Sequence, residues 1–160
     1  MEINTKDVAL TAIFAALYVG LGIVFAPISF LALQFRIAGV IRPAIAKKPL
    51  LVVGYAIGVV ITNFFSPFAG LLELVFMPLM SIVAGLAGYY AAKSFGKSYV
   101  VAGAVIAVII PISVSWMLNQ ILELPIAVTL PGLLLSEQIV NVLGSFIFRA
   151  VDSRYRWYEG

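Results

Sequence analysis

Four ionisable side chains stand within stretches of this chain that are otherwise apolar: Arg36, Arg42, Glu73 and Glu137. A charge in the hydrocarbon of a membrane costs free energy unless it is paired, hydrated or in contact with a ligand. Each of the four is therefore a candidate for ligand recognition or for a buried ion pair. Arg36 follows Gln34 just before a short apolar segment, and Arg42 lies roughly 9 Å deeper at helical rise.

The last apolar segment carries the most informative polar group. Glu137 and Asn141 are four residues apart and share one helical face, and Gln138 lies on the adjoining face. One interpretation is a row of donors and acceptors that lines a ligand cavity. The other is a buried ion pair between Glu137 and Arg42, with the amides linking helices. The two interpretations are compatible. Because Arg42 lies deeper than Arg36, it is the favoured partner of Glu137. Arg36, at the water-accessible outer boundary, is then expected to recognise the ligand.

Glu73 and Trp116 each have a structural and a functional interpretation. Glu73 begins an apolar segment, where the helix dipole favours a carboxylate, but it is equally suited to accept hydrogen bonds from an amino-bearing solute. Trp116 suits the membrane interface, and beside Asn119 and Gln120 its ring is also placed to stack on an aromatic solute. We expect ligand contacts from Glu73, Trp116 and Asn119.

The chain has no His and no Cys. Their absence removes histidine proton relays, thiolate nucleophiles, disulfides and most zinc or haem ligation. The sequence also lacks a glycine-rich nucleotide-binding motif, so we expect no catalytic centre, cofactor or metal. The formal net charge of +3 is no signal of nucleic-acid binding, because Lys and Arg mark the cytoplasmic ends of membrane proteins.

The candidate side chains must be positioned by membrane helices. Of the 160 residues, 63% are hydrophobic and 11% are charged, and the mean hydropathy of +1.13 lies outside the range of soluble domains. The pattern predicts an all-α integral membrane protein, a compact bundle of six transmembrane helices that forms a single domain over residues 1–160. The predicted spans are approximately residues 7–26, 35–47, 50–65, 71–92, 99–117 and 128–151. The second span is short and is expected to be tilted or partly inserted, and a polar connection with Asn119 and Gln120 is expected after the fifth.

The distribution of basic residues tests this arrangement. Apart from Arg36 and Arg42, every Lys and Arg falls before the first span, between the second and third, between the fourth and fifth, or at the end of the chain. The three opposite connections contain none. Because cytoplasmic connections are enriched in Lys and Arg, both termini are predicted to be cytoplasmic.

The first predicted span carries a stripe of small residues. Ala12, Ala16 and Gly20 recur at every fourth position and therefore share one helical face, where another helix can approach closely. Spacing alone favours internal packing and docking to a partner protein equally.

Several segments resemble a known transporter group. Six short helices, a first helix reading Ala9-Leu-Thr-Ala-Ile-Phe-Ala-Ala-Leu-Tyr18, and polar groups gathered at the outer end are similar to the substrate-binding S components of energy-coupling factor transporters. Within that group the chain most resembles the QueT-type branch, linked to queuosine precursors. The matching pieces are Pro27-Ile-Ser-Phe30, Gln34-Phe-Arg-Ile37, Ile61-Thr-Asn63 before Ser66-Pro67, and Leu72-Glu-Leu-Val-Phe76. Ala38-Gly39 and Met77-Pro78 stand where the branch usually has Ser-Glu and Gly-Ser.

The resemblance implies a multi-pass protein of a prokaryotic plasma membrane that captures a vitamin-like micronutrient from outside. The ligand would be a queuosine precursor or another ring-containing, water-soluble compound. Its partners would be a transmembrane coupling subunit, docked on the face of Ala12 and Ala16, and two ATP-binding subunits that supply the energy. The expected substrate-binding set is Gln34, Arg36, Asn63, Glu73, Trp116, Asn119, Glu137, Gln138 and Asn141.

Three other functions are compatible with parts of the pattern. A small self-sufficient secondary transporter would use Glu137 to exchange a proton with the medium. An intramembrane enzyme would need a nucleophile with a base, or metal ligands, and the sequence offers only isolated Ser residues and carboxylates. A structural assembly subunit would bind no small solute.

Overall fold

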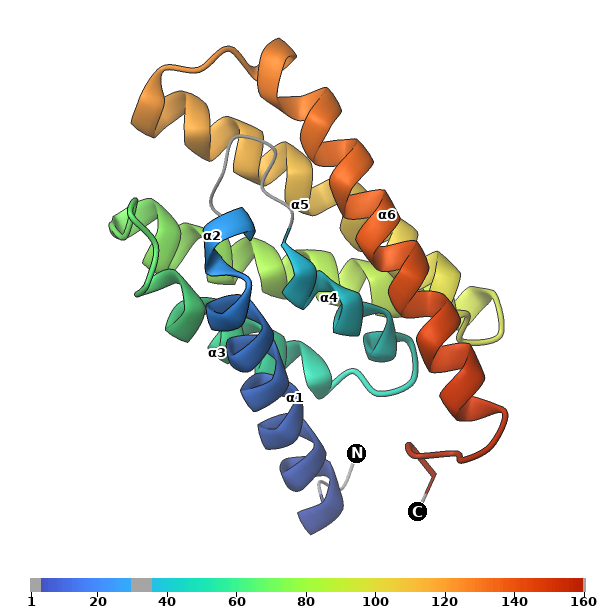
Figure 1. Ribbon diagram of the computed structural model, residues 1–160. Helices are drawn as coiled ribbons and strands as arrows, with labels where there is room; N and C mark the ends of the chain where they lie inside the picture. Colours follow the sequence, from blue (N-terminus) through green and yellow to red (C-terminus); the bar gives the residue numbers. More distant parts are fainter. Residues whose placement is uncertain (1–3, 30–35, 160) are drawn as a thin grey trace.

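The computed structural model describes residues 4–29 and 36–159. Gln34, predicted to bind substrate, lies outside these residues. The elements in chain order are α1 Thr5–Val24, α2 Ala26–Ser29, the 3₁₀ helix η1 Ile37–Ala46, α3 Leu51–Asn63, the π-helical turn η2 Leu72–Phe76, α4 Met77–Ser94, α5 Tyr99–Leu122 and α6 Ile126–Asp152. The predicted all-helical architecture is confirmed in this part of the chain (Figure 1).

The helices fall into two length classes. Four are long and apolar enough to cross a membrane: α1, η2 with α4, α5, and α6. By contrast, η1 and α3 are shorter apolar helices of 10 and 13 residues. At about 2.0 Å per residue for a 3₁₀ helix and about 1.5 Å for an α-helix, each is roughly 20 Å long. The six predicted spans are therefore four long helices and two short ones.

The short helix η1 lies inside the bundle. Pro43 lacks a backbone N–H, and Gly39 has a low helix propensity, so a regular α-helix is disfavoured here. Eight of its ten residues are buried, packed among α1, α4, α5 and α6. The backbones approach closely, because a Cβ at Gly144 of α6 would lie 1.9 Å from the carbonyl oxygen of Val40. Instead of facing lipid as a tilted span, η1 fills the centre of the fold.

Two small-residue faces are used for internal packing. A Cβ at Gly54 of α3 would lie 2.6 Å from the carbonyl oxygen of Thr11 in α1, and one at Gly58 would lie 2.9 Å from Tyr18. In α4, a Cβ at Gly88 would lie 2.9 Å from Ile106 of α5. These glycines let α3 approach α1 and α4 approach α5 at distances that larger residues would prevent.

Both chain ends lie at one end of the bundle (Figure 1). There Lys6 Nζ donates to the carbonyl of Glu159, Lys48 pairs with Asp7, and Lys47 Nζ lies 3.4 Å from Asp152 Oδ2. The predicted basic connections therefore meet at this end, which we call the basic end. The turns between α3 and η2 and between α5 and α6 lie away from it (Figure 1).

The connection between the fifth and sixth predicted spans, expected at residues 118–127, is shorter in the structure. Helix α5 continues to Leu122, so Asn119 and Gln120 belong to the helix and not to a loop. The helix ends where Glu123 takes a left-handed conformation with φ 56°. Asn119 Nδ2 donates to the carbonyl of Leu124 at 3.0 Å, and this bond holds the short turn into α6.

Candidate functional site

An ion pair between Arg36 and Glu73 lies at the end of the bundle opposite the basic end. Arg36 directly precedes η1, and Glu73 is the second residue of η2. Arg36 Nη2 lies 3.9 Å from Glu73 Oε1. The exposed fractions are 7% for Arg36 and zero for Glu73. The prediction that Arg36 stays water-accessible is therefore wrong, because η1 sinks into the bundle and carries the residue before it below the surface.

Most polar side-chain atoms of this outer pair, Arg36 and Glu73, lack hydrogen bonds within the described residues. Among the residues that the structure describes, Arg36 Nε and Nη2 and both carboxylate oxygens of Glu73 have no hydrogen-bond partner. The separation of 3.9 Å is at the limit of an ion pair and too long for a hydrogen bond. Buried charged groups without hydrogen bonds cost roughly 1–3 kcal/mol each or more. A ligand that donates to Glu73 and accepts from Arg36 would remove that cost.

The π-helical turn determines where Glu73 lies. The backbone N–H of Met77 donates to the carbonyl of Leu72 and not to that of Glu73. The next residue, Pro78, has no N–H to offer. The Glu73 carbonyl instead accepts from Asn63 Nδ2 at 2.8 Å. Asn63, predicted to bind substrate, is 2% exposed. The structure shows it hydrogen-bonded to the backbone of Glu73, which it holds in place.

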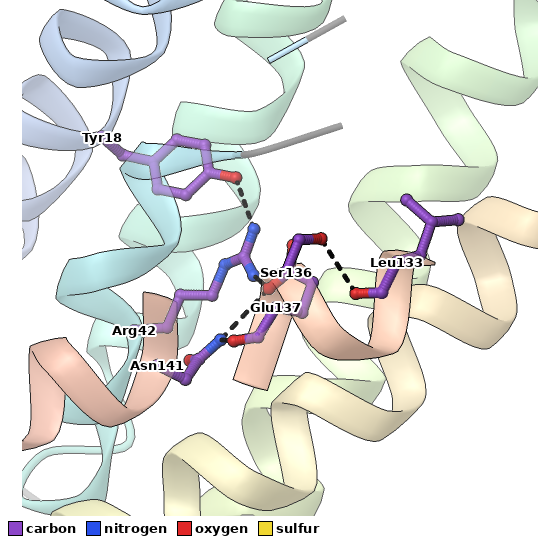
Figure 2. A network of polar contacts seen from close by, with 6 residues as sticks. All are labelled: Tyr18, Arg42, Leu133, Ser136, Glu137 and Asn141. Carbon is purple, nitrogen blue, oxygen red and sulfur yellow. Dashed lines mark hydrogen bonds and ion pairs between the residues drawn. The ribbon is translucent and has the colours of Figure 1, made fainter. Parts of the chain in front are cut away.

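A second ion pair lies within the bundle and has more hydrogen bonds than the outer one: both Nη atoms of Arg42 have partners, whereas Arg42 Nε has none among the described residues. Arg42 Nη1 is in hydrogen-bond contact with Glu137 Oε2, and Arg42 Nη2 donates to the Tyr18 hydroxyl at 3.2 Å (Figure 2). The guanidinium carbon also lies 5.3 Å from the ring centre of Tyr55, within the range of a cation–π contact. Arg42 is fully buried. It therefore joins η1 to α1, α3 and α6.

Asn141 completes this inner network. Its Nδ2 donates to the Glu137 carbonyl at 2.8 Å and to Glu137 Oε2 at 3.1 Å (Figure 2). Glu137 and Asn141 are 3% and 1% exposed. Gln138, on the adjoining face, is half-buried. The Glu137 carboxylate thus accepts from two side chains, and it lies in contact with Arg42 rather than open to solvent.

Two aromatic residues of the inner network escaped prediction: Tyr18, through its hydroxyl, and Tyr55, through its ring. Tyr18 and Tyr55 are 2% and 1% exposed, and their rings are 5.3 Å apart. In the sequence each stands in an apolar segment, where Tyr is an ordinary packing residue. Nothing in the sequence singles out these two residues. In the structure, Gly58 makes room for the Tyr18 ring, because a Cβ at Gly58 would lie 2.9 Å from Tyr18.

Trp116 of α5 packs against η2, the segment that contains Glu73. Its ring packs on Phe76, the last residue of η2, with ring centres 4.8 Å apart, and it stays 40% exposed. Asn119, one turn further along α5, is engaged in the turn to α6. Of the predicted contacts outside the two ion pairs, the structure therefore connects two to η2: Asn63 through the Glu73 carbonyl and Trp116 through the Phe76 ring.

A broad apolar groove runs along the surface where α1 packs against α3. Its volume is about 800 Å³. The residues that line it are Val8, Thr11, Ala12, Ala15, Ala16, Val19, Gly20, Leu50, Val53, Ile57 and Ile61. Ala12, Ala16 and Gly20 are exposed, and a Cβ at Gly20 would meet no atom within 4 Å. Their small size is therefore not used for packing within the described part of the chain.

Within residues 4–29 and 36–159, no group of three or more His, Cys, Asp or Glu side chains is placed to hold a metal ion. The chemistry on offer at the two ion pairs is hydrogen bonding and charge recognition.

Comparison with known families gives a match over almost the entire chain. No curated protein and no solved structure matches it significantly. The family model described as QueT transporter matches residues 8–153, a range that includes both ion pairs, the groove and the four long helices except the first three residues of α1. The protein is thus a multi-pass membrane transport protein and not an enzyme. The chain belongs to the QueT transporter family.

Proposed function

We propose that this protein is the substrate-binding S component of an energy-coupling factor importer and that it captures a queuosine precursor. One observation carries the ligand site: Arg36 and Glu73 are buried side by side while their polar atoms have no hydrogen bonds in the described residues. The family description supports a queuosine-related cargo. Trp116, packed on Phe76 of the same π-helical turn, supplies an aromatic surface.

The two charges suit a guanine-like ring. Such a ring presents adjacent N–H donors and a carbonyl acceptor along one edge. A carboxylate accepts two N–H bonds at once, and a guanidinium donates to a carbonyl oxygen. Glu73 would therefore accept from the donor edge, Arg36 would donate to the carbonyl, and Trp116 would contact the ring face.

Ligand binding can be measured by isothermal titration of the purified protein with queuine. Glu73→Gln and Arg36→Gln should each weaken binding about 10- to 150-fold, since a hydrogen bond to a charged group contributes roughly 1.5–3 kcal/mol. Glu123→Gln is the matched control, because Glu123 is an exposed carboxylate in the turn after α5. Unchanged affinity in both site variants would contradict the assignment of this site.

The groove between α1 and α3 is the proposed docking surface for the transmembrane coupling subunit, which two ATP-binding subunits would drive. Its support is that Ala12, Ala16 and Gly20 are exposed and leave room for close helix approach. The basic end would face the cytoplasm, as the enrichment of Lys and Arg in cytoplasmic connections requires. The Arg36 and Glu73 pair would then face the outer side.

Docking is tested by adding bulk to the groove. Ala16→Trp should abolish co-purification with the coupling subunit while queuine binding to the isolated protein stays unchanged. Ala104→Trp is the matched control, because Ala104 is an exposed alanine on α5, outside the groove. Equal complex formation by both variants would count against this surface.

The rival transporter would use Glu137 as a proton carrier. Because Glu137 is 3% exposed and in contact with both Arg42 and Asn141, the geometry supports a structural role instead. Liposomes that contain the purified protein alone should bind queuine without concentrating it. Uptake driven by a proton gradient in these liposomes would favour the rival.

A further inference from the structure

A polar cavity lies at the basic end of the bundle, away from the candidate ligand site. Its volume is about 520 Å³. Four basic side chains from separate segments line it: Lys47 after η1, Lys97 in the turn after α4, Arg149 in α6 and Arg156 in the C-terminal tail. Cytoplasmic enrichment of Lys and Arg explains their presence at this end, but it does not explain their convergence on one cavity.

The charges in this cavity are only partly neutralised. Asp152 lines it as well, and its Oδ2 lies 3.4 Å from Lys47 Nζ. Arg156 pairs with Glu159 at 3.0 Å, but both side chains are more than half exposed, so this contact contributes little. Lys97 and Arg149 are exposed and form no ion pair within residues 4–29 and 36–159.

A buried hydroxyl also lies in the cavity wall. Tyr99 is 3% exposed, and its hydroxyl has no hydrogen-bond partner in the described part of the chain. The ring is held in place by Phe148, stacked at 5.8 Å, and by the Lys47 ammonium, 4.7 Å from the ring centre. The hydroxyl oxygen itself is covered, so an oxyanion in the cavity would accept from the basic side chains that stay exposed, Lys97 and Arg149.

The position of the cavity identifies the source of that anion. It lies where α5 begins at Tyr99 and α6 ends at Asp152, and the ends of membrane-spanning helices are expected near the membrane surface. Phe95 lines it and is 68% exposed, so an apolar side chain lies next to the basic groups. Basic pockets between helix ends at this level suit lipid headgroups. We propose that this cavity binds the phosphate group of an anionic phospholipid.

Trp157 provides a local reporter of this lipid. Its ring packs 5.9 Å from Phe148, which in turn stacks on Tyr99. The chain has two tryptophans, and Trp116 lies on α5 near the opposite end, so Trp116→Phe leaves Trp157 as the single tryptophan whose emission is followed. Phosphatidylglycerol with brominated acyl chains, titrated into detergent micelles of this variant, should quench Trp157 at lower concentration than brominated phosphatidylcholine.

Charge variants separate the cavity from general surface attraction. Lys97→Ala and Arg149→Ala should each weaken the apparent binding of phosphatidylglycerol about 10-fold or more, since each loses a direct hydrogen bond to a charged group, which contributes roughly 1.5–3 kcal/mol. Lys93→Ala and Arg154→Ala, which remove exposed charges at the same end outside the cavity, should weaken it no more than about fivefold, the general contribution of a basic residue near the membrane surface. An unchanged thermal midpoint without added lipid shows that each variant is folded.

Three results would overturn the proposal. Equal quenching by brominated phosphatidylglycerol and phosphatidylcholine would mean that the headgroup charge is not recognised. Equal losses in the cavity and control variants would assign the effect to overall surface potential. Inorganic phosphate that raises the thermal midpoint as much as phosphatidylglycerol does would identify free phosphate as the ligand.

Discussion

Breaking the inner ion pair from one side should destabilise the protein severely. Arg42→Met keeps most of the side-chain volume but leaves the Glu137 carboxylate buried at 3% exposure, with Asn141 as its remaining side-chain donor. Removing one partner of a buried pair costs about 3–5 kcal/mol. For a chain of 160 residues, at about 2–4 °C per kcal/mol, the thermal midpoint should fall by roughly 6–20 °C.

The double variant shows whether Arg42 and Glu137 stabilise the protein as an interacting pair or through two independent contributions to the free energy of unfolding. Arg42→Met with Glu137→Gln removes both charges and keeps an amide that can still accept from Asn141. Most of the lost stability should return, because a buried pair replaced on both sides is often nearly neutral. Thermal unfolding of the wild type, both single variants and the double variant in one detergent gives the coupling energy. Additive effects, or an Arg42→Met protein as stable as the wild type, would refute the pairing argument.

Two further predictions concern the backbone. Gly144→Ala should prevent stable folding, because the added Cβ would lie 1.9 Å from the Val40 carbonyl oxygen. Gly20→Ala is the control, because its added Cβ would meet nothing within 4 Å, and its thermal midpoint should be unchanged or raised. Equal thermal midpoints for the two variants would contradict the close contact at Gly144. Asn63→Ala should weaken queuine binding and lower stability by about 1–3 kcal/mol, because it leaves the Glu73 carbonyl unbonded. Adding Pro78→Ala should restore part of both, since residue 78 regains an N–H, and titration calorimetry with thermal unfolding would show whether it does.

The long apolar helices and the pairing of Arg42 with Glu137 could be predicted from the sequence. The predicted boundaries of α1 and α6 lie within about two residues of the observed ones, because continuous apolar segments and polar ends mark them. The contact between Arg42 and Glu137 follows from the cost of leaving either charge alone in an apolar interior. Its contribution to stability remains a prediction for the double-variant experiment.

The burial of Arg36 and the bracing role of Asn63 could not be predicted. Both depend on backbone conformations that are unusual for apolar segments, the 3₁₀ helix η1 and the π-helical turn at Glu73. Pro43 and Pro78 indicate irregular backbone at these places, but a proline alone does not specify which carbonyl loses its partner. That depends on neighbouring helices, such as α3 with Asn63.

The inner ion pair has a consequence for the synthesis of this protein. Arg42 and its partner Glu137 are separated by 95 positions along the chain. At about 5–20 residues per second, Glu137 emerges roughly 5–20 s after Arg42. During that time η1 carries a charge without its carboxylate partner, so it cannot complete its packing while α3, α4 and α5 are made. The centre of the bundle is therefore assembled late, when α6 arrives, and a chain that stops before residue 137 leaves Arg42 without its partner in the membrane.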